Sequence, residues 1–248
     1  MLEIAAKLPP GALVGGEERL LAQALVRSGG ARFVAREADL VRHEGRITAW
    51  REAKGAVEAV AAAPNTGNSR FEAGPPGALV CSKGINCGFV LPGFAPAVTA
   101  FTVALVYSSG GEARTLASVS TGQAQNVIFL SEAEGRIVAK DKQNTVQAVL
   151  PLARSSRPRL AIVGYDGRSL WLQCDGQTLA QAGRVPGMDS PADFLIGCRS
   201  NRPGLTKLMG DCRIHEVIFW PDRALPLSEA TEDAQALAVL ARYVRWVY

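Results

Sequence analysis

One tryptophan in the second half of the chain has the neighbours that a sugar-binding platform needs. Trp171 and Gln173 alternate with three apolar residues, Leu170, Leu172 and Cys174. Because successive side chains of a strand point to opposite faces, we expect the three apolar side chains in a core and the other two opposite them. An aromatic ring stacks on a sugar ring and an amide hydrogen-bonds its hydroxyls. The pattern predicts a carbohydrate-binding face; the alternative is that Trp171 packs beneath a loop or the terminal helix.

Two polar loops supply further candidate ligand-binding side chains. One is the Thr-Gly-Gln-Ala-Gln-Asn segment, and the other follows Cys198. Their amide and guanidinium groups suit sugar hydroxyls, although polar residues are common in any surface loop. The candidates are Gln123, Gln125, Asn126, Arg199, Asn201 and Arg202.

The carboxylates do not form a recognisable catalytic pair. Glycosidases place two carboxyl groups about 5–9 Å apart. Glu132 and Glu134 fall in a predicted turn, and Glu216 adjoins His215 on a predicted strand, so those two side chains are expected on opposite faces. A nucleophilic triad also needs a base, and His43 is the one other histidine. The sequence therefore predicts a protein that is not an enzyme.

Calcium is the one metal for which ligands can be suggested. Asp166 and Asp211 would each supply one oxygen, but there is no Asp-x-Asp-x-Asp spacing. Turn formation explains both aspartates without a metal. We expect no cofactor, with calcium as the alternative.

The five cysteines are odd in number and include no C-x-x-C pair, which excludes a zinc ribbon and a redox motif. Buried free thiols are the simplest expectation. Cys198 and Cys212 lie at the end and the start of predicted strands, so a bridge between them stays open.

Composition indicates an ordinary packed domain. The chain has 248 residues, 48% of them hydrophobic, with a net charge of +4 and basic residues spread along its length. Nucleic acid binding would require clustered basic residues, so it is not expected. No secretory leader is recognised. The charge-free stretch Cys87–Tyr107 is interrupted by glycine and proline, which favours two buried strands over a membrane helix.

Short apolar runs recur at the spacing of an all-β sandwich. Asp166-Gly167 and Asp175-Gly176 separate three such runs and predict a three-stranded antiparallel meander with two-residue turns. The predicted strands are Arg46–Trp50, Ala100–Tyr107, Thr115–Ser120, Asn126–Leu130, Arg136–Lys140, Thr145–Leu150, Arg159–Tyr165, Ser169–Cys174, Thr178–Ala182, Phe194–Cys198 and Cys212–Trp220.

Both ends of the chain predict a helix. Residues 1–30 form an N-terminal arm with one short helix, whose apolar face would pack on the sandwich or dock a partner. Residues 31–248 form the sandwich and end in a helix from about Ser228, which is a plausible N-cap. The fold class is therefore all-β, with two antiparallel sheets, an N-terminal helical arm and a C-terminal helix.

Three segments in this order resemble a known superfamily. They are Glu44–Trp50, the hairpin over residues 165–176, and the closing strand Ile214–Trp220 with its tail. They resemble the concanavalin A-like lectin/glucanase superfamily, especially laminin-G-like jelly-roll domains of bacterial and phage proteins. The resemblance implies two curved sheets that bind sugars or proteins on the concave face or rim loops, sometimes with calcium.

The leading functional expectation is a non-catalytic carbohydrate-binding or adhesion module, such as a phage fibre or virion-like spike that recognises bacterial surface glycans. A poly- or oligosaccharide would be its partner, with neither nucleic acid nor membrane involved. The alternative is a structural or assembly protein that packs against its own copies or a particle scaffold. A glycoside hydrolase with carboxylates from different strands is the third possibility.

Overall fold

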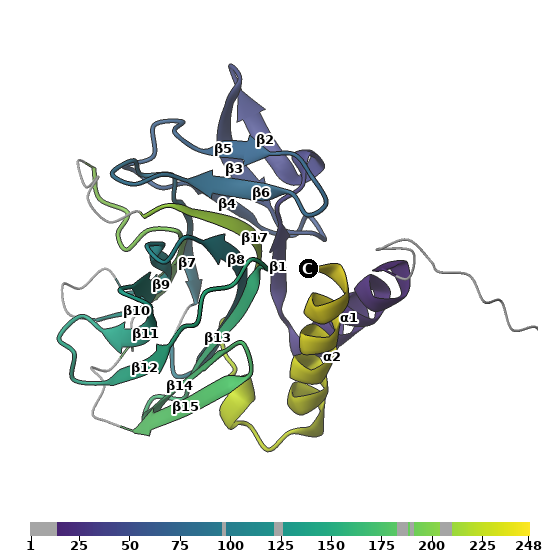
Figure 1. Cartoon of the computed structure of the whole chain (residues 1–248), viewed down its shortest axis with the longest axis vertical. Coiled ribbons are helices and arrows are strands. Elements are labelled where there is room, and N and C mark those ends of the chain that lie inside the picture. The colour runs from purple at the N-terminus through teal and green to yellow at the C-terminus, as the bar shows by residue number, and fades with distance from the viewer. Residues whose placement is uncertain (1–13, 96–97, 122–125, 183–187, 189–190, 204–209) are drawn as a thin grey trace, which may run out of the picture.

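The computed structural model describes residues 14–95, 98–121, 126–182, 188, 191–203 and 210–248. Figure 1 shows a β-sandwich with two helices lying side by side against it. The elements are α1 (Val14–Ser28), β1 (Ala31–Val34), η1 (Glu37–Asp39), β2 (Leu40–His43), β3 (Arg46–Arg51), β4 (Glu58–Ala61), β5 (Arg70–Glu72), β6 (Ala78–Cys81), β7 (Phe89–Ala95), β8 (Phe101–Ser109), β9 (Arg114–Ser120), β10 (Val127–Ala133), β11 (Arg136–Asp141), β12 (Gln147–Pro151), β13 (Arg159–Tyr165), β14 (Ser169–Cys174), β15 (Gln177–Ala182), β16 (Ala192–Ile196), β17 (Cys212–Trp220), η2 (Leu225–Leu227) and α2 (Thr231–Val247).

Two antiparallel sheets build the sandwich. Sheet A has the order β15-β14-β13-β8-β17-β6-β5, and β1 also pairs with β17. Sheet B has the order β12-β11-β10-β9-β16-β7-β4-β3-β2. The predicted fold class, an all-β two-sheet antiparallel sandwich with a helix at each end, is confirmed.

The buried apolar residues of the described part of the chain form two layers. The larger one lies between the sheets and includes stacked Phe194 and Phe219, whose ring centroids are 4.1 Å apart. The smaller one lies between the outer face of sheet A and the helices, and includes Leu21 of α1, Trp220 of β17 and Leu240 of α2. Strand β17 is buried on both faces because it contributes to both layers.

The meander β13-β14-β15 forms as the sequence predicts. Leu170, Leu172 and Cys174 are buried in the main core. The Asp175-Gly176 turn has two residues with positive φ, 49° and 82°, as primed turns require. At the other turn, β13 ends at Tyr165 and β14 begins at Ser169, and the Asp166 carboxylate accepts the backbone N–H groups of Arg168 and Ser169.

The predicted N-cap of the terminal helix is wrong. Helix α2 begins at Thr231 with Ala230 at its N-cap, and Ser228 Oγ instead accepts the backbone N–H of Ala230 at 3.1 Å. Within the described part of the chain, no helix is both long and apolar enough to cross a membrane.

Candidate functional site

A pocket of about 400 Å³ opens where β1, the β5–β6 connection, β17 and α2 meet. We call it the Tyr248 pocket. Its polar wall comes from charged and aromatic side chains, and its opposite wall is the small, glycine-rich turn before β6. A volume of this size is typical of small-ligand sites. The polar wall consists of Glu18, Arg36, Glu37, His215, Tyr243 and Tyr248.

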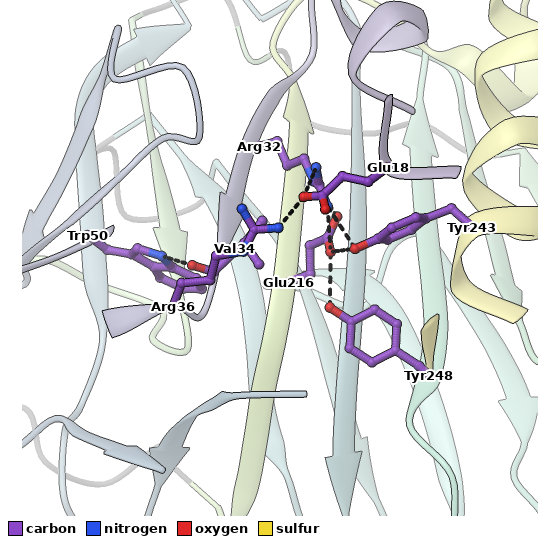
Figure 2. Close-up of polar contacts among 8 residues, drawn as sticks. All are labelled: Glu18, Arg32, Val34, Arg36, Trp50, Glu216, Tyr243 and Tyr248. Carbon is purple, nitrogen blue, oxygen red and sulfur yellow. Dashed lines mark hydrogen bonds and ion pairs between the residues drawn. The ribbon is translucent and has the colours of Figure 1, made fainter. Parts of the chain in front are cut away.

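A buried ion pair supports this wall from behind (Figure 2). Arg32 Nε lies 2.7 Å from Glu216 Oε1, and Arg32 Nη2 lies 3.3 Å from Glu216 Oε2. Two phenols also donate to Glu216 Oε2: Tyr243 Oη at 3.1 Å and Tyr248 Oη at 3.0 Å. Glu216 therefore accepts four hydrogen bonds, which compensates for the burial of its charge.

The environment keeps these phenols protonated. Burial and then the charge of Glu216 raise the pKa of Tyr248, and the same two causes raise the pKa of Tyr243. Burial opposes the charge of Arg32, but attraction to Glu216 outweighs it and raises the pKa of Arg32. The tyrosines thus act as hydrogen-bond donors that fix the pocket wall in place.

An irregularity in β17 brings His215 to the same wall. The register against β8 shifts between Ile214 and Glu216. His215 and Glu216 are therefore not on opposite faces of the strand, as simple alternation would predict. The His215 ring lies 5.6 Å from the Tyr248 ring, while Tyr248 donates to Glu216. His215 also contacts Gly77 O and Ser108 Oγ, and burial lowers its pKa.

Arg36 and Glu18 form the charged rim of the pocket. They make an ion pair, and Arg32 Nη1 lies 3.5 Å from the same Glu18 oxygen (Figure 2). Burial opposes the ionisation of Glu18, but Arg36 and Arg32 outweigh it and lower its pKa. A second pocket of about 340 Å³ shares Glu18 and Arg36 with the first.

The predicted platform, Trp171, lies elsewhere. It is half-buried on β14 and packs against the layer between sheet A and the helices. Gln173 is half-buried on the same strand, opposite Ile162 and Thr178 of the neighbouring strands.

The predicted loop residues that the structure describes lie beside sheet B. Arg199 stacks 3.9 Å from the Phe129 ring and donates to Thr115 Oγ1 at 2.8 Å. Asn201 Oδ1 accepts the backbone N–H of Ala63 at 2.7 Å. Arg202 is exposed. Asn126 is half-buried and its carbonyl accepts from Thr121, while Gln123 and Gln125 lie outside the described residues. These positions are not brought together with Trp171.

The two candidate calcium ligands accept hydrogen bonds from backbone N–H groups. Asp166 Oδ1 accepts the N–H groups of Arg168 and Ser169, and Asp211 Oδ1 accepts the N–H of Lys83. Over the described ranges, no three histidine, cysteine, aspartate or glutamate side chains are grouped to hold a metal ion.

Sequence reasoning missed most residues of the Tyr248 pocket. Arg32 and Glu216 are 184 positions apart, and no local pattern links them. A sequence signal did exist for Glu216, because a charged residue within the apolar run Ile214–Trp220 needs a partner when that strand is buried.

Comparison with known proteins supports the fold. No family model and no curated protein matches. Among solved structures, Trypanosoma rangeli sialidase matches with a TM-score of 0.50 and 14% identity, over 93% of this chain and 39% of that one. Domain 4 of AbnA, a GH43 arabinanase from Geobacillus stearothermophilus solved with arabinotriose, has a TM-score of 0.51 and 13% identity over 84% and 96%. A GH54 α-L-arabinofuranosidase has a TM-score of 0.54 and 11% identity over 79% and 51%.

These matches contradict two expectations from the sequence. We expected a non-catalytic carbohydrate-binding or adhesion module and no enzyme, but the similar structures are mainly glycoside hydrolases. Their identities to this chain establish the fold and no activity. The chain spans 39% of the sialidase it matches. What these matches establish is the β-sandwich fold alone.

Proposed function

We propose that this chain is a domain of a glycoside hydrolase and that its Tyr248 pocket binds a saccharide. The observation that carries the proposal is the composition of that pocket: two tyrosine rings, a histidine, an arginine and two carboxylates around about 400 Å³. Aromatic rings pack on sugar rings, and charged planar groups make the strongest hydrogen bonds to hydroxyls.

The ion-pair network makes this pocket preorganised. Glu216 fixes the Tyr248 ring through the phenol, and His215 packs against that ring. Side chains that are already ordered lose little conformational entropy when a ligand binds. The AbnA domain supports the proposal, because that domain was solved with a bound oligosaccharide and matches over nearly its whole length. The laminin-G-like family assignment and a saccharide partner are parts of the same proposal.

The test is a glycan array with the purified chain and two matched variants, one at a tyrosine and one at a tryptophan. Tyr248→Ala removes the pocket ring, and Trp171→Ala removes the ring that the sequence favoured. We expect saturable binding that Tyr248→Ala abolishes and Trp171→Ala keeps. Loss in Trp171→Ala alone would move the site to sheet A, and no binding by the folded wild-type chain would reject the proposal. Circular dichroism of each variant checks its fold.

Hydrolysis is a second candidate function, favoured by two carboxyl groups whose pKa values shift in opposite directions. Burial raises the pKa of Asp39 although Arg36 and other arginines oppose it, whereas Arg36 and Arg32 outweigh burial and lower the pKa of Glu18. Such divergence separates a general acid from an ionised partner.

A panel of 4-nitrophenyl glycosides tests this second candidate. Release of nitrophenol by the wild-type chain, with at least a hundredfold loss in both Glu18→Gln and Asp39→Asn, would support hydrolysis by this pair. No release by a wild-type chain that binds saccharide would reject hydrolysis and leave the binding proposal in place.

A further inference from the structure

Two cysteines from distant parts of the chain face each other inside sheet A. Cys81 is the last residue of β6, Cys212 is the first residue of β17, and the antiparallel register pairs them directly. Directly opposed residues in an antiparallel pair have Cα atoms about 4.5–5.5 Å apart. That spacing lies within the range of about 4.4–6.8 Å that disulfides span.

Both side chains point to the same place. Cys81 and Cys212 belong to the main core, with 4% and 3% of their surfaces exposed. Cys212 and burial together raise the pKa of Cys81. The register places the two side chains on the same face of the sheet, next to each other in the main core.

We propose that Cys81 and Cys212 are a disulfide site, which closes when the folded protein meets a small-molecule disulfide such as oxidised glutathione. One cysteine thiolate attacks the oxidant and releases one thiol, forming a mixed disulfide. The second cysteine then attacks its partner's sulfur and releases the second thiol. The two cysteines lose two electrons and two protons, and the oxidant is reduced to two thiols.

The other three cysteines lie in different surroundings. Cys87 Sγ lies 3.5 Å from Asn68 O, and Cys198 Sγ lies 3.9 Å from Phe89 O. Cys174 lies on β14 in the meander. Cys198 follows β16 of sheet B, so the bridge to Cys212 that the sequence left open would compete with a partner already opposite Cys212 in sheet A.

The cross-link would anchor one wall of the Tyr248 pocket. Strand β6 continues from the turn that lines this pocket, and the turn residue Gly77 contacts His215 Nδ1 through its carbonyl oxygen. Fastening β6 to β17 holds that turn against the strand that carries His215. The disulfide itself does not depend on the proposed function, because it follows from the strand register and the shared burial of the two cysteines.

We expect the pair to oxidise slowly, since a protonated, buried thiol is a poor nucleophile. We therefore expect formation to accelerate as the pH rises from 7 to 9. A disulfide that closes a long loop restricts the unfolded chain, so the oxidised protein should melt about 5–10 °C higher than the reduced one.

Peptide mapping tests the proposal on the full chain. The protein is incubated with oxidised glutathione or with dithiothreitol, quenched in acid, alkylated in denaturant and digested with trypsin. Cleavage at Lys83 and Lys207 separates the cysteines, so the expected product joins residues 71–83 to residues 208–213. The proposal is supported if these two peptides are linked in the oxidised sample and separate in the reduced sample.

Variants control for folding and for specificity. Cys212→Ala and Cys81→Ala should each lose the linked peptide and the rise in melting temperature, whereas Cys174→Ala should keep both. Full alkylation of Cys81 and Cys212 after oxidant treatment would overturn the proposal. So would residues 185–199 joined to residues 208–213, which would show a bridge to Cys198 instead.

Discussion

Arg32 holds Glu216 through two nitrogens, with Nε 2.7 Å from one carboxylate oxygen and Nη2 3.3 Å from the other. Arg32 lies on β1, which pairs with the β17 strand that carries Glu216. The same guanidinium lies 5.0 Å from the centre of the Tyr243 ring, so the pair also ties α2 to sheet A. One ion pair thus joins the N-terminal strand, the closing strand and the terminal helix behind the Tyr248 pocket.

Glu216→Ala should destabilise the protein by about 3–5 kcal/mol, because Arg32 would remain buried without its counter-charge. Urea denaturation of the variant and the wild type measures this difference. Glu58→Ala is the matched control: Glu58 and Arg51 are 3.4 Å apart but about half-exposed, so this loss should cost about 0–1 kcal/mol. Equal effects of the two substitutions would contradict the role of the buried pair.

Acid should destabilise the folded chain through His215. Burial lowers its pKa below the ordinary value of 6.5, so below about pH 6.5 the unfolded chain binds a proton that the folded chain resists. The stability present above that pH is therefore lost as the pH falls towards 5. His215→Gln should flatten this dependence, measured as denaturation midpoints from pH 7.5 to 5. His43→Gln is the control, because 78% of the His43 side chain is exposed. An unchanged slope in His215→Gln would contradict the account.

Gly210→Ala should destabilise the start of β17. A Cβ at this position would lie 1.6 Å from the carbonyl oxygen of Glu112, a backbone atom that cannot move aside cheaply. We expect a loss of roughly 1–3 kcal/mol in thermal or urea unfolding. Gly110→Ala is the control, since a Cβ there meets nothing within 4 Å. If Gly210→Ala is as stable as Gly110→Ala, the backbone at Gly210 does not lie so close to the carbonyl oxygen of Glu112.

Arg36→Ala should weaken saccharide binding at the pocket rim. A charged hydrogen bond is worth about 1.5–3 kcal/mol, which corresponds to a tenfold or greater rise in Kd. Isothermal titration with a saccharide from the array measures it. Arg51→Ala provides the comparison, because Arg51 pairs with Glu58 and does not line the pocket. If both variants bind as the wild type does, Arg36 does not contact the ligand.

The sequence predicted those elements whose patterns are local. Leu170, Leu172 and Cys174 alternate cleanly because β14 has one face in the main core, and Asp175-Gly176 marks its turn. Strands β1, β2, β4, β5 and β6 were missed, since each has only three or four residues and too few for a period to show. Their pairing is set by tertiary contacts rather than by local preference.

The candidate site was less accessible to sequence reasoning than the fold. Trp171 is predicted as a platform from alternation alone, and alternation does not show that this side chain packs against the layer between sheet A and the helices. Its role in sugar binding stays a prediction. The prediction that His215 and Glu216 point to opposite faces was wrong, because the strand register shifts before Glu216. The pairing of Cys212 with Cys81 likewise depends on which strands become neighbours.

The most direct test of the central claim is a crystal structure of the chain with the saccharide that the array identifies. The account predicts the sugar in the Tyr248 pocket, packed on the Tyr248 ring and within hydrogen-bond distance of Arg36. A saccharide bound instead at Trp171, or at the Arg199 loop, would contradict it.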